Sequence, residues 1–283
     1  MSKNFVQNAV LRQALLSAYR GYARAQLWRS GTRILVNSIP KAGTHLLTAE
    51  LEKLPHLQNS RLHIQAHLVN AASGGHRTEA FALDTKRVAK LIGTVRRGQF
   101  FSAHLMFTDE LDALLRAKGV RTIFMLRDPR AILVSRFHYI MGLKRHHLHD
   151  FLSREARSDE ERYRLLVEGH AGEPYMRPMA DMMRGFLPWL DSPATLSVRF
   201  EDLVGERGGG SMEAKLTALR RICDHIGLAP AGLEQQAATA AKATPTLRTG
   251  QANAWREALP PAALEAVERQ CGELIRAMGY PAE

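Results

Sequence analysis

A short loop near the start of the chain combines a lysine, a glycine and a hydroxyl. In NSIPKAGTHLL, residues 37–47, Lys41 comes two residues before Gly43, and Thr44 follows directly. A nucleoside-triphosphate loop runs G-x-x-x-x-G-K-[ST], with its lysine after the last glycine and a hydroxyl beside it for magnesium. The early lysine leaves three interpretations: a degraded kinase loop, an ordinary strand-to-helix turn with a solvated lysine, or a loop built for a different anion.

The residues around this loop make an anion site possible. The apolar run 33–38 predicts a strand, and the leucine spacing after Thr44 predicts a helix. Such a turn directs backbone N–H groups and the positive end of a helix at whatever lies above the sheet. Gly43 lets the backbone come close, and Lys41 supplies a mobile charge. A single glycine is a weak signature, so the interpretation depends on further motifs.

A second motif carries an arginine and a serine eight residues apart. In MLRDPRAILVSRFHYI, the Asp-Pro pair at 128–129 predicts a helix N-cap and first helical residue. Arg127 then ends a strand, and Ser135 lies two turns into the helix. The planar guanidinium can bind two phosphate oxygens at once, and a serine hydroxyl can complete the shell. The alternative is an N-capped helix with surface arginines, the role we expect for Arg130 and Arg136.

A third, weaker motif lies near the carboxyl terminus. In TPTLRTGQANAWREAL, residues 244–259, Arg248 and Gly250 occupy a turn-like stretch before the last helix. An arginine beside a glycine is suited to form a second wall of a phosphate site.

The rest of the pattern predicts a parallel sheet covered by helices, since short β-rich runs alternate with helical stretches. These runs are 33–38, 99–105, 121–127 and 195–202. The polar stretch 144–174 is interpreted as an excursion from the core with a helical middle, and 205–211 as a loop. Ligands bind beyond the carboxyl ends of such strands, where the motifs lie.

Composition bounds the class of protein and of partner. The 283 residues are 45% hydrophobic and 24% charged, with a net charge of +11. One sizeable core is feasible, and the charge suits nucleic acid, anionic lipid, a sulfated or phosphorylated ligand, or a merely solvated basic surface. Cys223 and Cys271 are too few for a disulfide framework and have no metal-ligand spacing. Residues 1–30 predict an amphipathic helix, which could touch a membrane or pack on its own domain, without a signal peptide. We therefore expect a cytoplasmic protein.

Together the three motifs resemble, in order and spacing, the nucleotide-binding elements of sulfotransferases that use 3′-phosphoadenosine 5′-phosphosulfate (PAPS). The counterparts are PKAGT, RDPRAILVS and RTG, so the resemblance covers about residues 33–256. It implies an α/β three-layer sandwich with a central parallel sheet, like that of P-loop nucleotide hydrolases. Residues 1–283 then form a single sulfotransferase domain with a helical extension at 1–30, and the insertion 144–174 lies near the acceptor site.

The resemblance also implies the residues that hold the donor, PAPS, without a metal. They are Lys41, Ala42, Gly43, Thr44 and His45 at the 5′-phosphosulfate, Arg127, Ser135, Arg248, Thr249 and Gly250 at the 3′-phosphate, and Phe200 near the adenine. His104, after a strand between the two phosphate motifs, matches the family's base, with an expected pKa near 6.5. Lys41 would stabilise charge on the leaving oxygen.

Departures from the family pattern concern mainly the adenine and the acceptor. Ala42 replaces a common serine, His45 and Leu46 replace a threonine-tryptophan pair, and Thr249 replaces a lysine. These changes resemble bacterial members with glycan, glycolipid or natural-product acceptors.

Two other functions remain as alternatives, and the remaining histidines have no assigned role. A P-loop kinase should show a Walker loop and an acidic strand end for magnesium, and neither is evident. A non-catalytic anion-binding module explains the charge but not the order of the motifs, and we expect no nucleic acid partner. His138 and the 146–149 cluster are expected at the surface or in packing, with acceptor binding by His146 or His147 left open.

Overall fold

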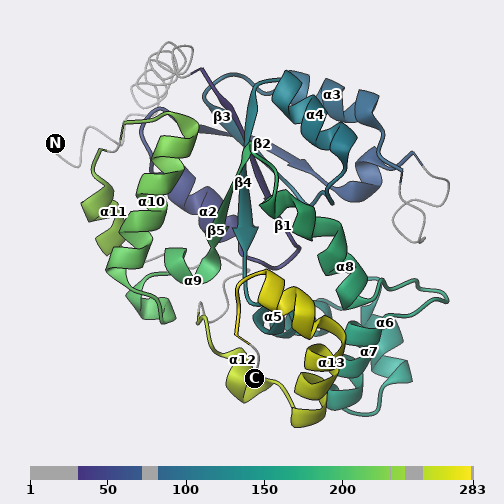
Figure 1. Ribbon diagram of the computed structural model, residues 1–283. Coiled ribbons are helices and arrows are strands. Elements are labelled where there is room, and N and C mark those ends of the chain that lie inside the picture. Colours follow the sequence, from purple (N-terminus) through teal and green to yellow (C-terminus); the bar gives the residue numbers. More distant parts are fainter. Residues whose placement is uncertain (1–30, 72–81, 230, 240–250, 282–283) are drawn as a thin grey trace, which may run out of the picture.

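A single five-stranded parallel sheet organises the residues that the computed structural model describes, which are 31–71, 82–229, 231–239 and 251–281. The strands are β1 (Arg33–Ser38), β2 (Gln58–Ile64), β3 (Gln99–Ala103), β4 (Val120–Leu126) and β5 (Thr195–Arg199). Their order across the sheet is β2-β3-β1-β4-β5. Figure 1 shows these strands in the middle of the molecule, surrounded by helices. Because β1 pairs with both β3 and β4, the loops after these three strands open at the same edge.

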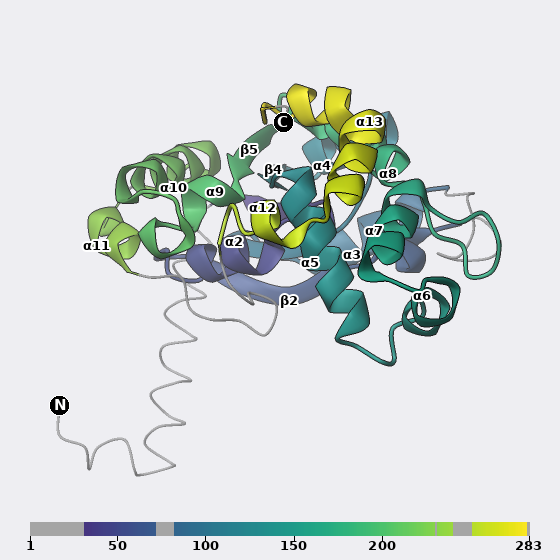
Figure 2. The same ribbon diagram turned by 90° about the horizontal axis from the view of Figure 1, so that it is seen from below.

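Helices cover both faces of the sheet. In chain order they are α2 (Thr44–Leu51), η2 (Ala66–Val69), α3 (Thr85–Gly93), α4 (Asp109–Ala117), α5 (Pro129–Met141), α6 (His149–Glu155), α7 (Asp159–Glu168), α8 (Met179–Phe186), η4 (Leu187–Leu190), α9 (Phe200–Leu203), η5 (Glu206–Gly208), α10 (Met212–Ile226), α11 (Leu233–Ala238), α12 (Trp255–Ala258) and α13 (Pro261–Ala277). Figure 2 shows α10 and α11 on one side of the sheet and α7, α8 and α13 on the other.

Two apolar clusters fix these layers. Successive residues of β1 alternate between them: Ile34 and Val36 pack with α2, α10 and α11, whereas Leu35 packs in the larger cluster with α4, α5, α8 and α13. This alternation follows from the two-residue period of a strand. The segment 144–174 contributes buried side chains to the larger cluster, among them Leu152 and Leu166.

The predicted parallel sheet and its alternation with helices are confirmed, with two differences. The strands expected over 99–105 and 195–202 end earlier, at Ala103 and Arg199, and Phe200 begins the short helix α9. The edge strand β2 was not predicted, because QNSRLHI lacks an apolar run and most of its side chains are partly exposed.

Two observations bear on membranes. The amphipathic helix expected over 1–30 lies outside the described residues. Among the residues described, no helix combines the length and the apolar character that crossing a bilayer requires.

Candidate active site

The loop between β1 and α2 has an unusual backbone. Lys41 adopts φ 75° and Gly43 adopts φ 109°, so both lie in the left-handed region. This conformation costs an ordinary residue about 1–2 kcal/mol, and such strain is concentrated at functional sites. The N–H of Ala42 donates to Ile39 O at 3.0 Å, which tightens the turn. The loop thus holds Lys41 in a conformation that local preference alone does not favour.

Gly43 is required by its surroundings as well as by its backbone. A Cβ atom built there would lie 2.6 Å from Cδ2 of Phe200, the first residue of α9. Real Cβ atoms do not approach carbon this closely, so the position accepts only a residue without a side chain. The sequence pointed to Gly43 for ligand approach, and the structure adds the contact with Phe200.

Arg127 follows β4 and reaches the same loop. Its Nη1 donates to Lys41 O at 3.2 Å, and its guanidinium carbon lies 4.2 Å from the centre of the Phe200 ring. Its Nε is buried and has no hydrogen-bond partner in the described part of the chain. Burial lowers the pKa of Arg127, while Glu201 opposes this change. The structure therefore brings Lys41, Gly43, Phe200 and Arg127 together at one place.

Glu201 supports Arg127 and was missed by the sequence analysis. Its carboxylate accepts hydrogen bonds from the N–H of Asp128 at 3.1 Å and from the hydroxyl of Tyr280 at 2.8 Å. Burial raises the pKa of Glu201, whereas these hydrogen bonds and Arg127 lower it. The only sequence signal was its position directly after Phe200.

The predicted N-cap of α5 is confirmed, but the expectation for Arg130 was wrong. The Asp128 side chain accepts from the N–H of Arg130 at 2.9 Å, with Pro129 as first helical residue. The Arg130 side chain is completely buried. It pairs with Asp128 at 2.9 Å and Glu268 at 3.0 Å and donates to Pro281 O at 2.9 Å. Because these acceptors satisfy its charge, Arg130 joins α5 to α13 instead of facing solvent.

The other predicted 3′-phosphate residues are less defined. Ser135 lies half-buried in the second turn of α5 and makes no side-chain hydrogen bond to any described residue. Arg248, Thr249 and Gly250 lie outside the described residues. All four assignments stay predictions.

His104 follows β3 and is fixed against the end of β1. Its Nδ1 lies 2.9 Å from the carbonyl oxygen of Ser38. A carbonyl can only accept, so Nδ1 carries the proton and the lone pair of the neutral ring is on Nε2. The next residue, Leu105, exchanges two hydrogen bonds of 2.8 and 3.0 Å with the buried Asn37 amide, which fixes the backbone at this point.

The expected pKa of His104 near 6.5 was wrong. Burial lowers it to about 4, the hydrogen bond to Ser38 opposes the change, and the charges of His63, His45 and Lys41 act with burial. The His63 ring meets that of His104 edge-on at 5.1 Å, and its Nδ1 lies 2.9 Å from Ser102 Oγ. His63 belongs to β2, the strand that was not predicted.

Hydroxyl groups connect His104 to the Lys41 loop. Ser38 Oγ lies 2.6 Å from Thr44 Oγ1 and 3.3 Å from His104 Nδ1. Thr44 is buried, so its hydroxyl is already engaged within the protein. The following residue, His45, is exposed, and its pKa is lowered by partial burial and by Lys41.

The side chain of Lys41 has an aromatic neighbour. Its Nζ lies 4.0 Å from the centre of the Tyr139 ring, which comes from the end of α5. Burial lowers the pKa of Lys41, and the charge of Arg127 adds to this effect. A cation near an aromatic face is attracted to it, so Tyr139 helps to orient the lysine.

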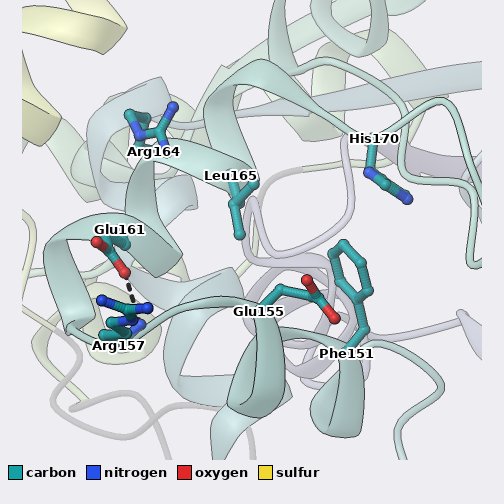
Figure 3. Close-up of a pocket in the computed structure, with 7 residues that line it drawn as sticks. All are labelled: Phe151, Glu155, Arg157, Glu161, Arg164, Leu165 and His170. Atoms are coloured by element: carbon teal, nitrogen blue, oxygen red, sulfur yellow. Dashed lines mark hydrogen bonds between the residues drawn. The ribbon is translucent and has the colours of Figure 1, made fainter.

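A separate cavity of about 280 Å³ lies on α6, α7 and the residues after them. Figure 3 shows its lining, which is a mixture of acidic, basic and aromatic side chains: Phe151, Glu155, Arg157, Glu161, Arg164, Leu165 and His170. None of the motif residues lines it. Nor do the described residues contain a group of three or more His, Cys, Asp or Glu side chains that could hold a metal ion.

Comparison with solved structures agrees with the fold. The structure of mouse sulfotransferase SULT7A1 complexed with PAP aligns with a TM-score of 0.54 and 15% identity, covering 92% of each chain. Retinol dehydratase in a complex with retinol and PAP aligns with a TM-score of 0.51 and 15% identity, covering 91% of this chain and 86% of that one. At this identity the likeness concerns the fold.

Sequence comparison identifies the family. Carbohydrate sulfotransferase 2 of Homo sapiens is 29% identical over 205 residues, which are 60% of this chain and 37% of the relative. The Mus musculus protein of the same name is 28% identical over 197 residues, 58% of this chain and 35% of that protein. The chain thus matches little more than a third of the length of these relatives. The family described as Sulfotransferase domain matches residues 31–210. The chain therefore belongs to the sulfotransferase domain family.

Proposed function

We propose that this protein transfers the sulfuryl group of PAPS to an acceptor hydroxyl. The observation that carries the proposal is the meeting of three groups at one edge of the sheet: the left-handed Lys41 loop, the partly buried guanidinium of Arg127 and the unprotonated Nε2 of His104. Membership of the sulfotransferase domain family supports it. The solved relatives described as complexes with PAP support PAPS as the donor substrate.

The donor fits the anion-binding groups of this edge. Lys41, the N–H groups of the loop and the start of α2 would hold the 5′-phosphosulfate. Arg127 would bind the 3′-phosphate through its partly exposed guanidinium. Ser135, Arg248, Thr249 and Gly250 remain proposed 3′-phosphate contacts, and Phe200 a proposed adenine contact. Since Phe200 is fully buried under Arg127, it would offer adenine only its edge or act through the arginine.

The proposed reaction is an in-line displacement at sulfur. Nε2 of His104 takes the proton of the acceptor hydroxyl as its oxygen forms a bond to sulfur. The bond between sulfur and the bridging oxygen breaks, and the electron pair leaves with 3′,5′-adenosine bisphosphate (PAP). The Lys41 ammonium stabilises the negative charge that develops on this oxygen. The protein therefore contributes position, one proton acceptor and one cation, as in phosphoryl transfer.

The low pKa of His104 is compatible with this role in the presence of donor. The shift arises from burial and from three neighbouring groups that carry or can carry positive charge, Lys41 among them. A bound anion beside Lys41 offsets these charges and raises the affinity of Nε2 for a proton. Donor binding would thus prepare the base that the acceptor needs.

The acceptor is proposed as a hydroxyl of a glycan, glycolipid or natural product. The printed names of the curated relatives point to carbohydrate. Tyr139 and His146 join the Lys41 loop to the start of the 144–174 segment, because their rings lie 5.5 Å apart. This contact supports the proposal that the segment lies near the acceptor.

One experiment tests the proposal against a kinase and against a non-catalytic binding module. The protein is incubated with 35S-labelled PAPS and an acceptor panel, and calorimetry measures its affinity for PAP and for ATP. We expect transfer of label and binding of PAP but not ATP. Failure of PAP to bind would overturn the proposal, and tight ATP binding would favour the kinase.

The histidine is tested with a matched pair of variants. We expect His104→Asn to abolish transfer while the Kd for PAP changes by no more than about threefold, because the substitution removes only the proton acceptor. His56→Asn, at an exposed position, is the control and should retain turnover. Normal turnover in His104→Asn would exclude the base role.

A further inference from the structure

A row of aromatic rings extends from the catalytic lysine toward the surface. The Tyr139 ring lies under Nζ of Lys41, and His146 meets it edge-on with 5.5 Å between ring centres. His147 stacks on His146 at 4.5 Å. Tyr139 is 43% exposed, which is high for a large aromatic side chain beside an active site. We call Tyr139, His146 and His147 the ring row.

The ring row presents a hydrogen-bond donor. Nδ1 of His146 accepts from the N–H of Leu148 at 3.2 Å, so in the neutral ring the proton is on Nε2. Burial, together with the neighbouring groups His147, Arg136, His149 and Lys41, lowers the pKa of His146 to about 4. His146 is consequently neutral near pH 7, with Nε2–H as a donor.

Arg136 adds a cation that has no counter-ion among the described residues. It lies on α5 one turn before Tyr139, close enough to lower the pKa of His146. Its side chain is partly buried, and burial lowers its pKa to about 10, so it remains charged near pH 7. Its one hydrogen bond to a described residue is long, 3.5 Å from Nη1 to Leu166 O, and no described carboxylate lies within ion-pair distance.

The contrast with Arg130 on the same helix is informative. Arg130 is surrounded by two carboxylates and a carbonyl oxygen, as a buried guanidinium requires. Arg136 makes only one long hydrogen bond to a described residue, and none of its nitrogens is among the buried unpaired atoms, so its remaining N–H groups are accessible to water or to a ligand. Sequence analysis placed both arginines at the surface, and the structure separates them.

The electrostatics of this region have one sign. Every neighbouring ionisable group that shifts the pKa of Lys41, His45, His63 or His146 is an arginine, lysine or histidine. The carboxylate that is nearest to His146 in the sequence, that of Asp150, is exposed and lies 3.0 Å from Nδ1 of His149. The donor would neutralise Lys41, but the Arg136 charge would remain.

We propose that Arg136 and the ring row bind an anionic group of the acceptor, which is therefore an acidic sugar or a similar hydroxyl compound bearing a carboxylate or sulfate. This inference rests on the proposed sulfotransferase function and narrows its acceptor. Arg136 and Nε2–H of His146 bind the anion, the Tyr139 ring packs against the face of the sugar, and the reacting hydroxyl is directed toward His104.

The test uses two tetrasaccharides that differ only in charge. One alternates glucuronic acid with N-acetylglucosamine, and the other is the same molecule with its carboxyl groups reduced to alcohols. Calorimetry measures both affinities with and without saturating PAP. We expect the acidic form to bind about tenfold more tightly, the difference that a charge-assisted hydrogen bond supplies. In Arg136→Gln the two forms should bind within about twofold of each other.

Controls separate a local effect from net charge and from misfolding. Arg220→Gln removes the same charge from the surface of α10, where Arg220 forms an exposed pair with Glu234. This variant should keep the preference for the acidic form. Arg136→Lys keeps the charge and should therefore retain part of the preference for the acidic form, even if Arg136→Gln is poorly folded. The proposal is overturned if the wild type binds both forms equally, if the acidic form does not bind measurably, or if Arg136→Gln keeps the full preference. Loss of PAP binding alone would count against the sulfotransferase function, because the sugar titrations without PAP do not depend on the donor.

Discussion

Replacing Gly43 by alanine would disturb the donor site through the backbone and through Phe200. Gly43 has φ 109°, and the new Cβ would lie 2.6 Å from Cδ2 and 3.3 Å from Cε2 of the Phe200 ring. Neither atom belongs to the far end of a flexible chain, and the ring is fully buried. The ring must therefore move, and the Arg127 guanidinium 4.2 Å from its centre loses its support.

The strained backbone and the collision with Phe200 should together lower the free energy of unfolding by a measurable amount. A left-handed backbone costs an ordinary residue about 1–2 kcal/mol, and overpacking a buried site costs about 1–3 kcal/mol. We expect Gly43→Ala to lower the free energy of unfolding by about 2–5 kcal/mol, short of complete unfolding for a protein of ordinary stability. Partial loss of the Arg127 contact should also weaken PAP binding by about tenfold.

Urea unfolding and PAP calorimetry test this reasoning with a matched control. Gly227 has φ 72°, and a Cβ there would meet no atom within 4 Å, so Gly227→Ala isolates the backbone effect. It should cost about 1–2 kcal/mol and leave PAP affinity unchanged. If both variants lose the same free energy of unfolding, the Cβ that Gly43→Ala adds does not collide with Phe200. If Gly43→Ala binds PAP normally, Phe200 does not position Arg127.

Three further predictions concern the arginines and the base. Arg127→Met should raise the Kd for PAP at least about tenfold, while Arg220→Met leaves it unchanged; equal affinities in calorimetry would contradict the 3′-phosphate assignment. Arg130→Met should lower the free energy of unfolding by about 3–5 kcal/mol, because the buried Asp128 and the partly buried Glu268 lose their counter-ion. A clearly smaller loss in denaturant titration would contradict this reasoning. A base acts when unprotonated, and the lowered pKa of His104 keeps it so on the acid side of 6.5. In the pH profile of kcat/KM for PAPS, the acid limb should therefore fall near pH 4, and a limb near 6.5 would refute the shift.

Local pattern predicted the parts of the fold whose signals are local. The apolar runs of β1, β3 and β4 and the Asp-Pro start of α5 reflect burial and capping, which act within a few residues. The edge strand β2 has no such signal, because it is held mainly by pairing with β3. Its His63, which lies against His104, was lost with it.

The supporting contacts of the site depend on long-range packing. Glu201 meets Tyr280 across 79 residues, and Asn37 meets Leu105 across 68. Neither pair has a signature in the sequence. The pKa of His104 likewise depends on burial by residues from several elements, so the ordinary value was the only available expectation. Local motifs thus identify the residues that are expected to contact a ligand, whereas long-range packing fixes the positions of those residues.

Ser38 links the Lys41 loop and His104 into a single unit. Its carbonyl orients His104, its hydroxyl meets Thr44, and its place at the end of β1 is fixed by pairing with Met125 of β4. The spacing between the Lys41 loop and His104 is thus set by strand register and does not depend on the 144–174 segment. Residues 144–149, which begin the segment proposed to lie near the acceptor, could therefore diverge in evolution, or be redesigned, while the contacts of Ser38 with the loop and with His104 stay intact.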